Sequence, residues 1–462
     1  MKVPLLVVGG GLSGLAAAIR TARFNPEVLL LEKHSRLGGL NSYFYRNGQM
    51  FETGLHAITN YSPATDKQAP LNKLLRQLKL RRENLSFCQQ IKSEIIFQDL
   101  AKLCFSNDRQ VLCDSIRTTF PGSVARFERL LQVVSDYDPF TPSPFRSAHA
   151  IVSEILDNSL LTEMLFCPLM FYGSCRENDM DFGQFVIMFR SIFLEGFFRP
   201  AGTIKDLLDL LQSQLLRLGG RIRTKSAVAK ILTRDKKIVG VQLTDGETIA
   251  CDYLLSTIGY LETLGLLDTP PPGVQESTPR LSFFETIFQT SPLALPIKEK
   301  TTILFFNQGA KFQYRAPEEK VDLSSGVICF PNHFENLPER PQHEIRTTHL
   351  ANYLAWKKLA EQPQQYQEEK HVVACRSKEA VANLIGSFPG NIVYENTFTP
   401  VTIERYTAKL GGAIYGSPDK RLDGRIGYEN LFLAGTDQGF LGIVGSMLSG
   451  VSIVNQHILP RI

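Results

Sequence analysis

A glycine-rich turn near the N-terminus has the residue types and spacing of a phosphate-binding loop. Gly9-Gly10-Gly11-Leu12-Ser13-Gly14 fits the pattern G-x-G-x-x-G, where x is any residue. In that pattern the first glycine permits a tight turn, the second lets the backbone approach a pyrophosphate, and the third lets a helix pack on a strand. All the residues of this turn are therefore predicted to contact a dinucleotide cofactor.

The flanking segments are those that such a loop needs. Leu5-Leu6-Val7-Val8 is a continuous apolar run, typical of a parallel strand buried on both faces, and a helix rich in small residues follows the loop. The N-terminus of that helix offers free N–H groups and a partial positive charge to phosphates. Glu32 ends the next apolar run, and with Lys33 it is predicted to lie at the ribose, where its charge disfavours the 2′-phosphate of NADP.

A second glycine pair follows shortly afterwards. Arg36-Leu37-Gly38-Gly39 is succeeded by Phe51-Glu52-Thr53-Gly54-Leu55-His56. This succession resembles the FAD-containing superfamily of amine oxidases and phytoene desaturases, whose second glycine pair lets the backbone pass the flavin side of the dinucleotide. The resemblance implies FAD as the cofactor. The family usually has arginine directly after the pair; here Leu40 stands at that position, and Arg36 is the candidate for the phosphate contact.

The resemblance extends through most of the chain and is strong again at the C-terminus. Arg199-Pro200-Ala201-Gly202-Thr203 is similar to the family's Pro-x-Gly-Gly segment. The further positions that the resemblance assigns to the cofactor are Val228 at the adenine, Thr257 and Gly259 at the end of the nucleotide-binding half, Gly435, Thr436 and Asp437 at the ribityl and phosphate end, and Gly442, Ile443 and Val444 at a helix N-terminus facing the flavin ring.

The branch of the superfamily is indicated by the same C-terminal residues. Gly435-Thr436-Asp437 followed by Gly442-Ile443-Val444-Gly445 resembles retinol saturase and the related carotenoid isomerases and desaturases, although Leu441 replaces the usual proline. This resemblance implies an apolar small-molecule substrate, a long polyene or isoprenoid. Desaturation, saturation and isomerisation all stay open.

Few residues suggest chemistry beyond that of a flavin. His56, next to the second glycine pair, is the first candidate for a proton donor or acceptor, followed by Glu52 and Tyr415. The sequence contains no G-x-S-x-G elbow and no cluster of metal ligands, so we expect no metal site. Because it holds a single dinucleotide fingerprint, we expect electrons to pass to or from a quinone, oxygen or an external donor rather than NADPH.

Two other functions are compatible with this scaffold. A flavin amine oxidase would need an aromatic cage near the C-terminal motif, where Gly439-Phe440 offers at most one wall. A non-catalytic isoprenoid or lipid carrier, on the scaffold of the Rab GDP-dissociation inhibitors, would not need the phosphate loop or Glu32.

The predicted fold class is α/β, with a Rossmann-type FAD-binding domain of glutathione-reductase-like topology and an inserted mixed α+β substrate domain. The FAD-binding domain is predicted to be discontinuous, over 1–60, 195–262 and 405–462. The substrate domain is predicted over 61–194 and 263–404. Within the predicted FAD-binding domain, residues 227–255 show three strand-like runs separated by turns. Residues 204–218 show the periodicity of an amphipathic helix.

Composition and charge exclude several classes of protein. The net charge of the 462 residues is +4, far below the charge of a nucleic-acid-binding surface. The eight cysteines contain no Cys-x-x-Cys pair and indicate a reducing compartment. We find no N-terminal signal segment and no apolar run of 18 residues, so we expect a cytoplasmic protein. Peripheral contact with a membrane stays open.

Overall fold

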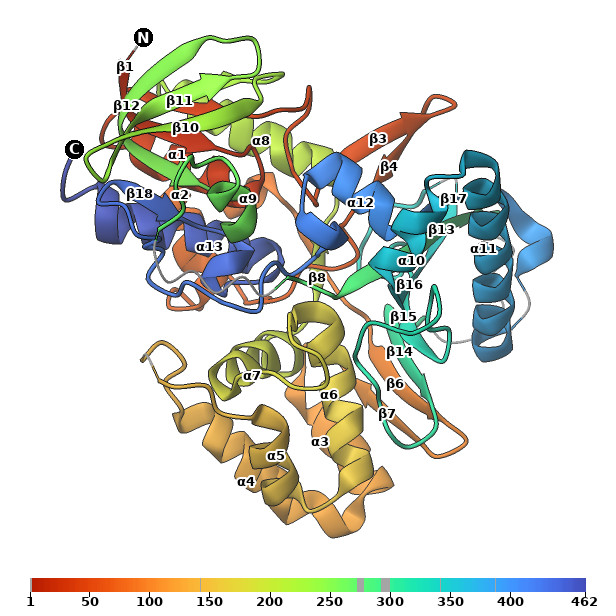
Figure 1. Ribbon diagram of the computed structural model, residues 1–462. Coiled ribbons are helices and arrows are strands. Elements are labelled where there is room, and N and C mark those ends of the chain that lie inside the picture. The colour runs from red at the N-terminus through yellow and green to blue at the C-terminus, as the bar shows by residue number, and fades with distance from the viewer. Residues whose placement is uncertain (1, 142, 272–277, 292–299, 341, 387) are drawn as a thin grey trace.

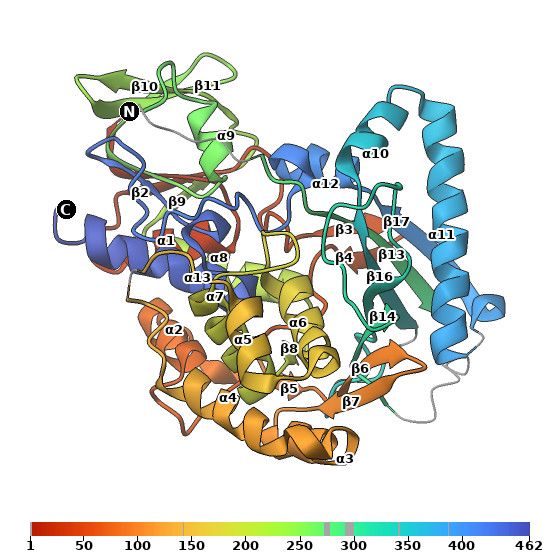
Figure 2. The same cartoon turned by 60° about the horizontal axis from the view of Figure 1, so that its bottom comes forward.

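The computed structural model describes residues 2–141, 143–271, 278–291, 300–340, 342–386 and 388–462. Two large sheets organise the chain, and both termini lie beside the first of them (Figures 1 and 2). No helix within these ranges has the length and apolarity required to cross a bilayer.

The first sheet is the predicted nucleotide-binding sheet. Its parallel strands run in the order β9-β2-β1-β12-β18, and the meander β10-β11 continues antiparallel from β12. The central strands β1 and β2 are apolar and almost wholly buried because helices and the meander cover both faces. The strands are β1 (Lys2–Val8), β2 (Val28–Leu31), β9 (Arg221–Arg223), β10 (Val228–Arg234), β11 (Lys237–Leu243), β12 (Thr248–Ser256) and β18 (Leu431–Leu433).

Four helices cover one face of this sheet. Helices α1 and α13 pack so closely that a methyl group added at Gly450 would lie 2.1 Å from Ser13 O. α2 packs on both of them, although its residues fall in the range predicted for the substrate domain. The helices are α1 (Leu12–Ala22), α2 (Pro70–Leu78), α8 (Ile204–Arg217) and α13 (Gly442–Ile453), with α9 (Tyr260–Leu264) on the opposite face.

The second sheet has the strand order β17-β13-β16-β15-β14-β6-β7. It is antiparallel except between β14 and β6, and β13 is buried along its whole length. The strands are β6 (Ser93–Gln98), β7 (Ala101–Phe105), β13 (Ser282–Thr290), β14 (Ile303–Gln308), β15 (Ser325–Cys329), β16 (His343–Ala351) and β17 (Ile392–Phe398).

Helices lie on both faces of the second sheet (Figures 1 and 2). On the face that we call the inner face, the apolar core is shared with α3 (Arg109–Thr119), α4 (Val124–Asp136), α5 (Ala148–Leu156), α6 (Ser159–Gly173) and α7 (Phe182–Phe189). The outer face carries α10 (Tyr353–Leu359) and α11 (Pro363–Ile385).

Short elements connect the two halves. β3 (Tyr43–Arg46) and β4 (Gln49–Glu52) form a hairpin, and β5 (Phe87–Gln89) pairs antiparallel with the distant β8 (Phe198–Pro200). The remaining helix is α12 (Pro400–Thr407). The single turns of 3-10 or π helix are η1 (Arg82–Asn84), η2 (Pro121–Ser123), η3 (Arg190–Leu194), η5 (Pro389–Asn391), η6 (Leu410–Gly412), η7 (Thr436–Gln438) and η8 (Val454–Ile458).

The local predictions for the first half are confirmed. The three predicted runs form β10, β11 and β12, and the amphipathic stretch forms α8, which ends before Gly219 with a φ of +87°. Thr203 and Asp206 close the start of α8 as a capping box.

Candidate functional site

The phosphate loop lies between β1 and α1, as predicted. The Gly9 N–H donates to Leu31 O at 2.9 Å, which ties the loop to β2. Gly11 is the N-cap of α1 and no side chain caps the helix, so N–H groups of its first turn stay open to a ligand. In that turn Ser13 Oγ is buried and has no hydrogen-bond partner in the described part of the chain. A bound group would supply one.

The glycines of the loop fall into two kinds. A methyl group added at Gly14 would lie 2.0 Å from Gly9 O, so the packing of helix on strand requires Gly14. Gly9 needs its φ of +108°. Gly11 differs, because it has an ordinary φ of −73° and an added methyl group would meet nothing nearer than Gly38 O at 4.0 Å. The protein alone leaves room for a side chain there, which a ligand passing close to the backbone would fill.

Glu32 lies against this loop at the end of β2. Its carboxylate is buried and accepts hydrogen bonds from the N–H groups of Gly10 and His34, each at 2.8 Å. A carboxylate has further acceptor positions, so contact with a ribose remains compatible with these bonds. Lys33 is adjacent and half-buried, and Ser226 N donates to Glu32 O at 2.9 Å, which brings the start of β10 with Val228 to the same edge.

The second glycine pair lies directly beside the first. Gly38 N donates to Gly10 O at 2.9 Å, and a methyl group added at Gly39 would lie 3.5 Å from Gly11 Cα. Leu40 O accepts a hydrogen bond from Thr53 Oγ1 at 2.7 Å. The Arg36 guanidinium instead lies over the ring of Tyr43, at 5.4 Å from its centroid, and its predicted phosphate contact stays a prediction.

The more distant motifs also converge on the phosphate loop. Thr257 Oγ1 donates to Gly9 O at 3.1 Å, and Gly259, with a φ of +123°, turns the chain into α9. A methyl group added at Gly435 would lie 3.8 Å from Ser13 Cβ, which places the start of η7, with Thr436, against the first turn of α1.

Asp437 is used by the protein itself. It is buried, and its two carboxylate oxygens accept from Tyr260 N at 2.6 Å and Ser417 N at 2.7 Å. Burial alone would raise the pKa of Asp437, but Lys409, Lys420 and the two backbone donors outweigh it and hold the pKa below its ordinary value. The carboxylate therefore joins three loops, and its predicted contact with the cofactor stays a prediction.

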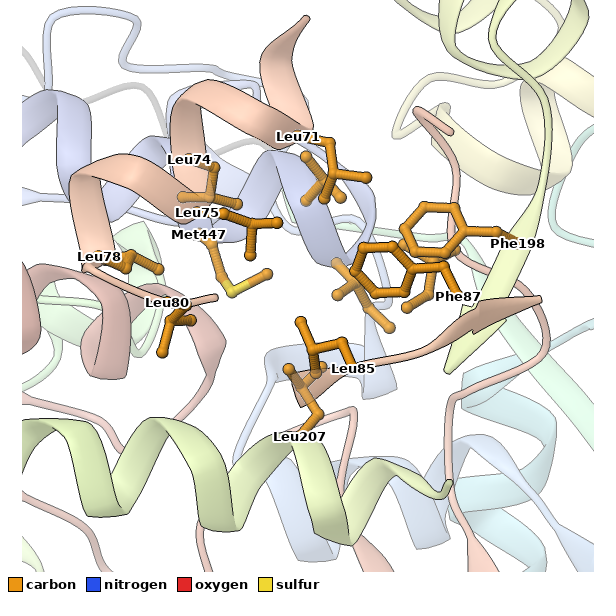
Figure 3. A pocket seen from close by; sticks show the side chains of 13 residues that line it. Leu71, Leu74, Leu75, Leu78, Leu80, Leu85, Phe87, Phe198, Leu207 and Met447 are labelled. Carbon is orange, nitrogen blue, oxygen red and sulfur yellow. The ribbon is translucent and has the colours of Figure 1, made fainter. Parts of the chain in front are cut away.

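The start of α13 faces two different surroundings. No side chain caps the helix, and a methyl group added at Gly442 would lie 3.5 Å from Thr59 Oγ1. Ile443 and Val444 also line an apolar pocket of about 20 Å³. Leucines of α2 and Met447 of α13 point into this pocket (Figure 3). We therefore expect these two residues to meet a cofactor through their N–H groups. The pocket is too small for an isoprenoid.

His56 lies where the two halves meet. Its Nε2 is 3.1 Å from Glu285 Oε1 on β13, and Arg346 Nη1 lies 3.7 Å from the same oxygen. The His56 side chain is 20% exposed, and its Nδ1 has no hydrogen bond from the described residues. Nearby, Gly54 packs against Leu40 O, so the segment from His56 to Thr59 runs between the second glycine pair and the start of α13.

The other two candidates for proton transfer are held by the protein. Glu52 is buried and accepts from Arg199 Nη2 and Ile204 N, both at 2.6 Å. Its pKa lies below the ordinary value because Arg199, Arg346 and the Ile204 N–H outweigh the effect of burial. The Tyr415 hydroxyl donates to Phe171 O, and burial raises its pKa. Of the three, only His56 has a side-chain polar atom without a hydrogen bond from the described residues.

Comparisons with known proteins agree with this arrangement. The model of the family "flavin containing amine oxidoreductase" matches residues 12–283. The chain belongs to this family. It is 22% identical to an all-trans-retinol 13,14-reductase of Danio rerio, covering 98% of this chain and 86% of that one. It is also 22% identical to a prolycopene isomerase of an Oncidium hybrid cultivar, over 91% of this chain and 76% of that one. The crystal structure of an oxidoreductase from Methanosarcina mazei, at 14% identity and a TM-score of 0.66 over 99% of this chain, shares its fold.

The chain is thus an oxidoreductase that uses FAD, and the loop fits that cofactor. The open N–H groups of α1, the unpartnered Ser13 hydroxyl and the room at Gly11 suit a pyrophosphate. When bound, FAD supplies the capacity to accept or donate a hydride. The residues would supply its position and the surrounding electrostatics.

Replacing Gly11 by alanine is expected to lower FAD affinity roughly tenfold or more while costing less than about 1 kcal/mol of stability. The added methyl group finds room in the protein but not beside a pyrophosphate. Flavin absorption of the purified variant and its circular dichroism measure the two effects. Gly14→Ala is the control, because there the methyl group would collide with Gly9 O and the fold itself should suffer. Normal flavin content in Gly11→Ala would refute this assignment of the loop.

Two residues of this site, Glu285 and Arg346, were not predicted from the sequence. Glu285 and Arg346 come from strands of the second sheet, and Glu285 lies 229 positions from the His56 that it contacts. A single acid within the apolar run Phe283-Phe284-Glu285-Thr286-Ile287-Phe288 is a signal of a buried polar contact, but it does not name the partner.

Proposed function

We propose that this FAD-dependent oxidoreductase acts on a long apolar polyene or isoprenoid. The observation that carries the proposal is the placement of His56 and Glu285 at the inner face of the second sheet. The apolar core on that face includes Phe283, Phe305 and Cys329, and the buried Arg346 lies beside Glu285. An apolar chain lying there would meet the His56–Glu285 pair. The names of the retinol reductase and the prolycopene isomerase support this substrate class.

In this proposal the protein residues orient the chain, exclude water and move one proton. Glu285 fixes the His56 ring through Nε2, and the unbonded Nδ1 exchanges the proton with a substrate carbon. Glu52 serves the fold through its ion pair with Arg199. Electrons pass to or from a quinone, oxygen or another external donor. Saturable NADPH oxidation by the purified enzyme would contradict that part of the proposal.

We further propose the domain boundaries given above, with the FAD-binding domain over 1–60, 195–262 and 405–462. Limited proteolysis of the holoenzyme checks them, because cleavage should concentrate in the connections between the two sheets.

An amine oxidase activity is less well supported. Phe440, the aromatic wall that the sequence suggests beside the C-terminal motif, stacks on the exposed Phe140 at 6.2 Å between ring centroids. It is thereby occupied at the surface rather than in a cage. A lipid carrier without cofactor leaves the room at Gly11 unexplained.

The first experiment is a visible spectrum of the purified protein with solvent extraction of any bound compound. We expect a flavin spectrum and a co-purifying polyene. Anaerobic mixing with polyenes and with amines then follows flavin bleaching and product formation. Turnover of amines alone would replace the proposal by the amine-oxidase reading, and absence of flavin after reconstitution would favour the carrier.

Replacing His56 by glutamine is expected to lower kcat by about 10²–10⁴-fold with flavin content unchanged, because the proton donor or acceptor is lost. His149→Gln is the matched control. His149 Nε2 also lies 3.1 Å from a glutamate, Glu163, but on α5 and α6, so kcat should stay at the wild-type value. Equal kcat in both variants would remove His56 from the mechanism.

A further inference from the structure

Three tyrosines belong to the core at the inner face of the second sheet, and one of their hydroxyls has no hydrogen-bond partner among the described residues. Tyr314 donates to Ser174 O at 3.0 Å, and Tyr415 donates to Phe171 O. The Tyr172 hydroxyl oxygen is buried and has no hydrogen bond within the described residues. Leaving such a group unpaired costs about 1–3 kcal/mol, so a native protein that does so usually has a partner elsewhere.

Tyr172 stands near the end of α6 and faces the sheet. Its ring lies 5.0 Å from Phe197 and 5.7 Å from Phe305, measured between centroids, and both of these residues are fully buried. The Tyr172 residue nevertheless keeps some accessible surface. We infer that this surface faces the proposed substrate at the inner face of the second sheet.

The electrostatic surroundings connect Tyr172 with the proposed proton-transfer pair. Burial raises the pKa of Tyr172 well above its usual value, and Cys329, Tyr415 and Glu285 add to the effect. The hydroxyl therefore keeps its proton at neutral pH and can donate it. Glu285 is the carboxylate that binds His56, so Tyr172 and His56 belong to one neighbourhood.

This hydroxyl can donate a hydrogen bond to an acceptor carried by a bound ligand. The two rings packed on Tyr172, those of Phe197 and Phe305, offer its hydroxyl no acceptor. An oxygen atom on an apolar ligand needs only the one donor. We propose that Tyr172 is a specificity-determining residue that donates a hydrogen bond to an oxygen-bearing end group of the substrate. This inference rests on the polyene function proposed above.

The test compares two probes on the holoenzyme, all-trans-retinol and its hydrocarbon analogue that lacks the hydroxyl group. Binding is followed by the change in polyene absorption. We expect wild-type protein to bind the alcohol roughly 2–10-fold more tightly, as one net hydrogen bond gives. Tyr172→Phe should remove this preference and leave the affinity for the hydrocarbon unchanged. Tyr314→Phe, the matched control, should keep the preference.

Two results would overturn the inference while leaving the polyene function standing: equal affinity of wild-type protein for both probes, or a preserved preference in Tyr172→Phe. Failure of wild-type protein to bind either probe would instead remove the polyene function and the inference with it. Stability without substrate gives an independent reading. Tyr172→Phe should be at least as stable as wild type, whereas Tyr314→Phe should be less stable because Ser174 O loses its donor. Equal losses in both would show that Tyr172 already has an internal partner.

Discussion

Replacing Arg199 by methionine is expected to lower the free energy of unfolding by about 3–5 kcal/mol. Arg199 is fully buried, and its Nη2 lies 2.6 Å from Glu52 Oε2, whose side chain is 4% exposed. Removing the guanidinium leaves a carboxylate that water cannot reach, with Ile204 N as its nearest remaining donor. Urea denaturation of the ligand-free protein measures the loss.

A double variant separates the charge effect from packing. Adding Glu52→Gln to Arg199→Met removes the stranded charge, so most of the lost stability should return. Arg117→Met is the surface control, since its pair with Asp114 has both side chains 55% exposed and should contribute less than about 1 kcal/mol. If the double variant is no more stable than Arg199→Met, the ion pair is not the cause of the loss.

The ion pair with Arg199 shows that Glu52, a candidate for proton transfer in the sequence, has a structural role. Its pKa lies below the ordinary value, so the stabilisation is present at neutral pH and is lost as the pH falls through the folded-state pKa. From the sequence, a glutamate two residues before a glycine and four before His56 suggests chemistry. Only the fold shows that Arg199, 147 positions away, already holds it.

The parts of the site that the sequence predicted are those whose contacts are local. The strand, glycine loop and helix around Gly9 to Gly14 are contiguous, and their period and residue types follow from one short segment. Glu32 could be placed because a βαβ unit has a nearly fixed length. The three runs of the meander are also contiguous, and they form β10, β11 and β12.

The site residues that the sequence did not predict depend on pairing between distant strands. β13 lies between β16 and β17, and this order determines that Glu285 and Arg346 share a face with His56. No periodicity in the sequence encodes that neighbour relation. The contacts of Asp437 with Tyr260 N and Ser417 N also join distant segments, and the sequence did not predict them.

Glu195 is expected to make the free energy of unfolding depend on pH. This partly buried residue follows η3, and its Oε2 accepts from Asn60 Nδ2 at 2.8 Å. Burial raises its pKa from 4.5 to about 7; Asn60 and Arg190 oppose the increase, and Asp66 adds to it. Asn60 Oδ1 in turn accepts from Thr59 Oγ1, the atom beside Gly442, so the carboxyl is linked to the start of α13.

The direction of this pH dependence follows from the pKa of Glu195 in the folded and in the unfolded protein. The folded protein keeps the Glu195 proton up to about pH 7, whereas the unfolded chain releases it near 4.5. The stabilisation from the neutral carboxyl is therefore complete below pH 4.5 and is lost as the pH rises through 7. The difference in pKa corresponds to about 3 kcal/mol as an upper bound.

Glu195→Gln should consequently gain stability over wild type as the pH rises from 5 to 8, by up to about 3 kcal/mol, because glutamine stays neutral and still offers an oxygen to Asn60. Urea denaturation of both proteins at several pH values measures the change. Glu83→Gln, at an exposed position, should differ from wild type by a constant amount over the same range. If the difference between Glu195→Gln and wild type is also constant with pH, the Glu195 carboxyl has the same pKa in the folded and the unfolded protein. Protonation of Glu195 would then contribute nothing to stability.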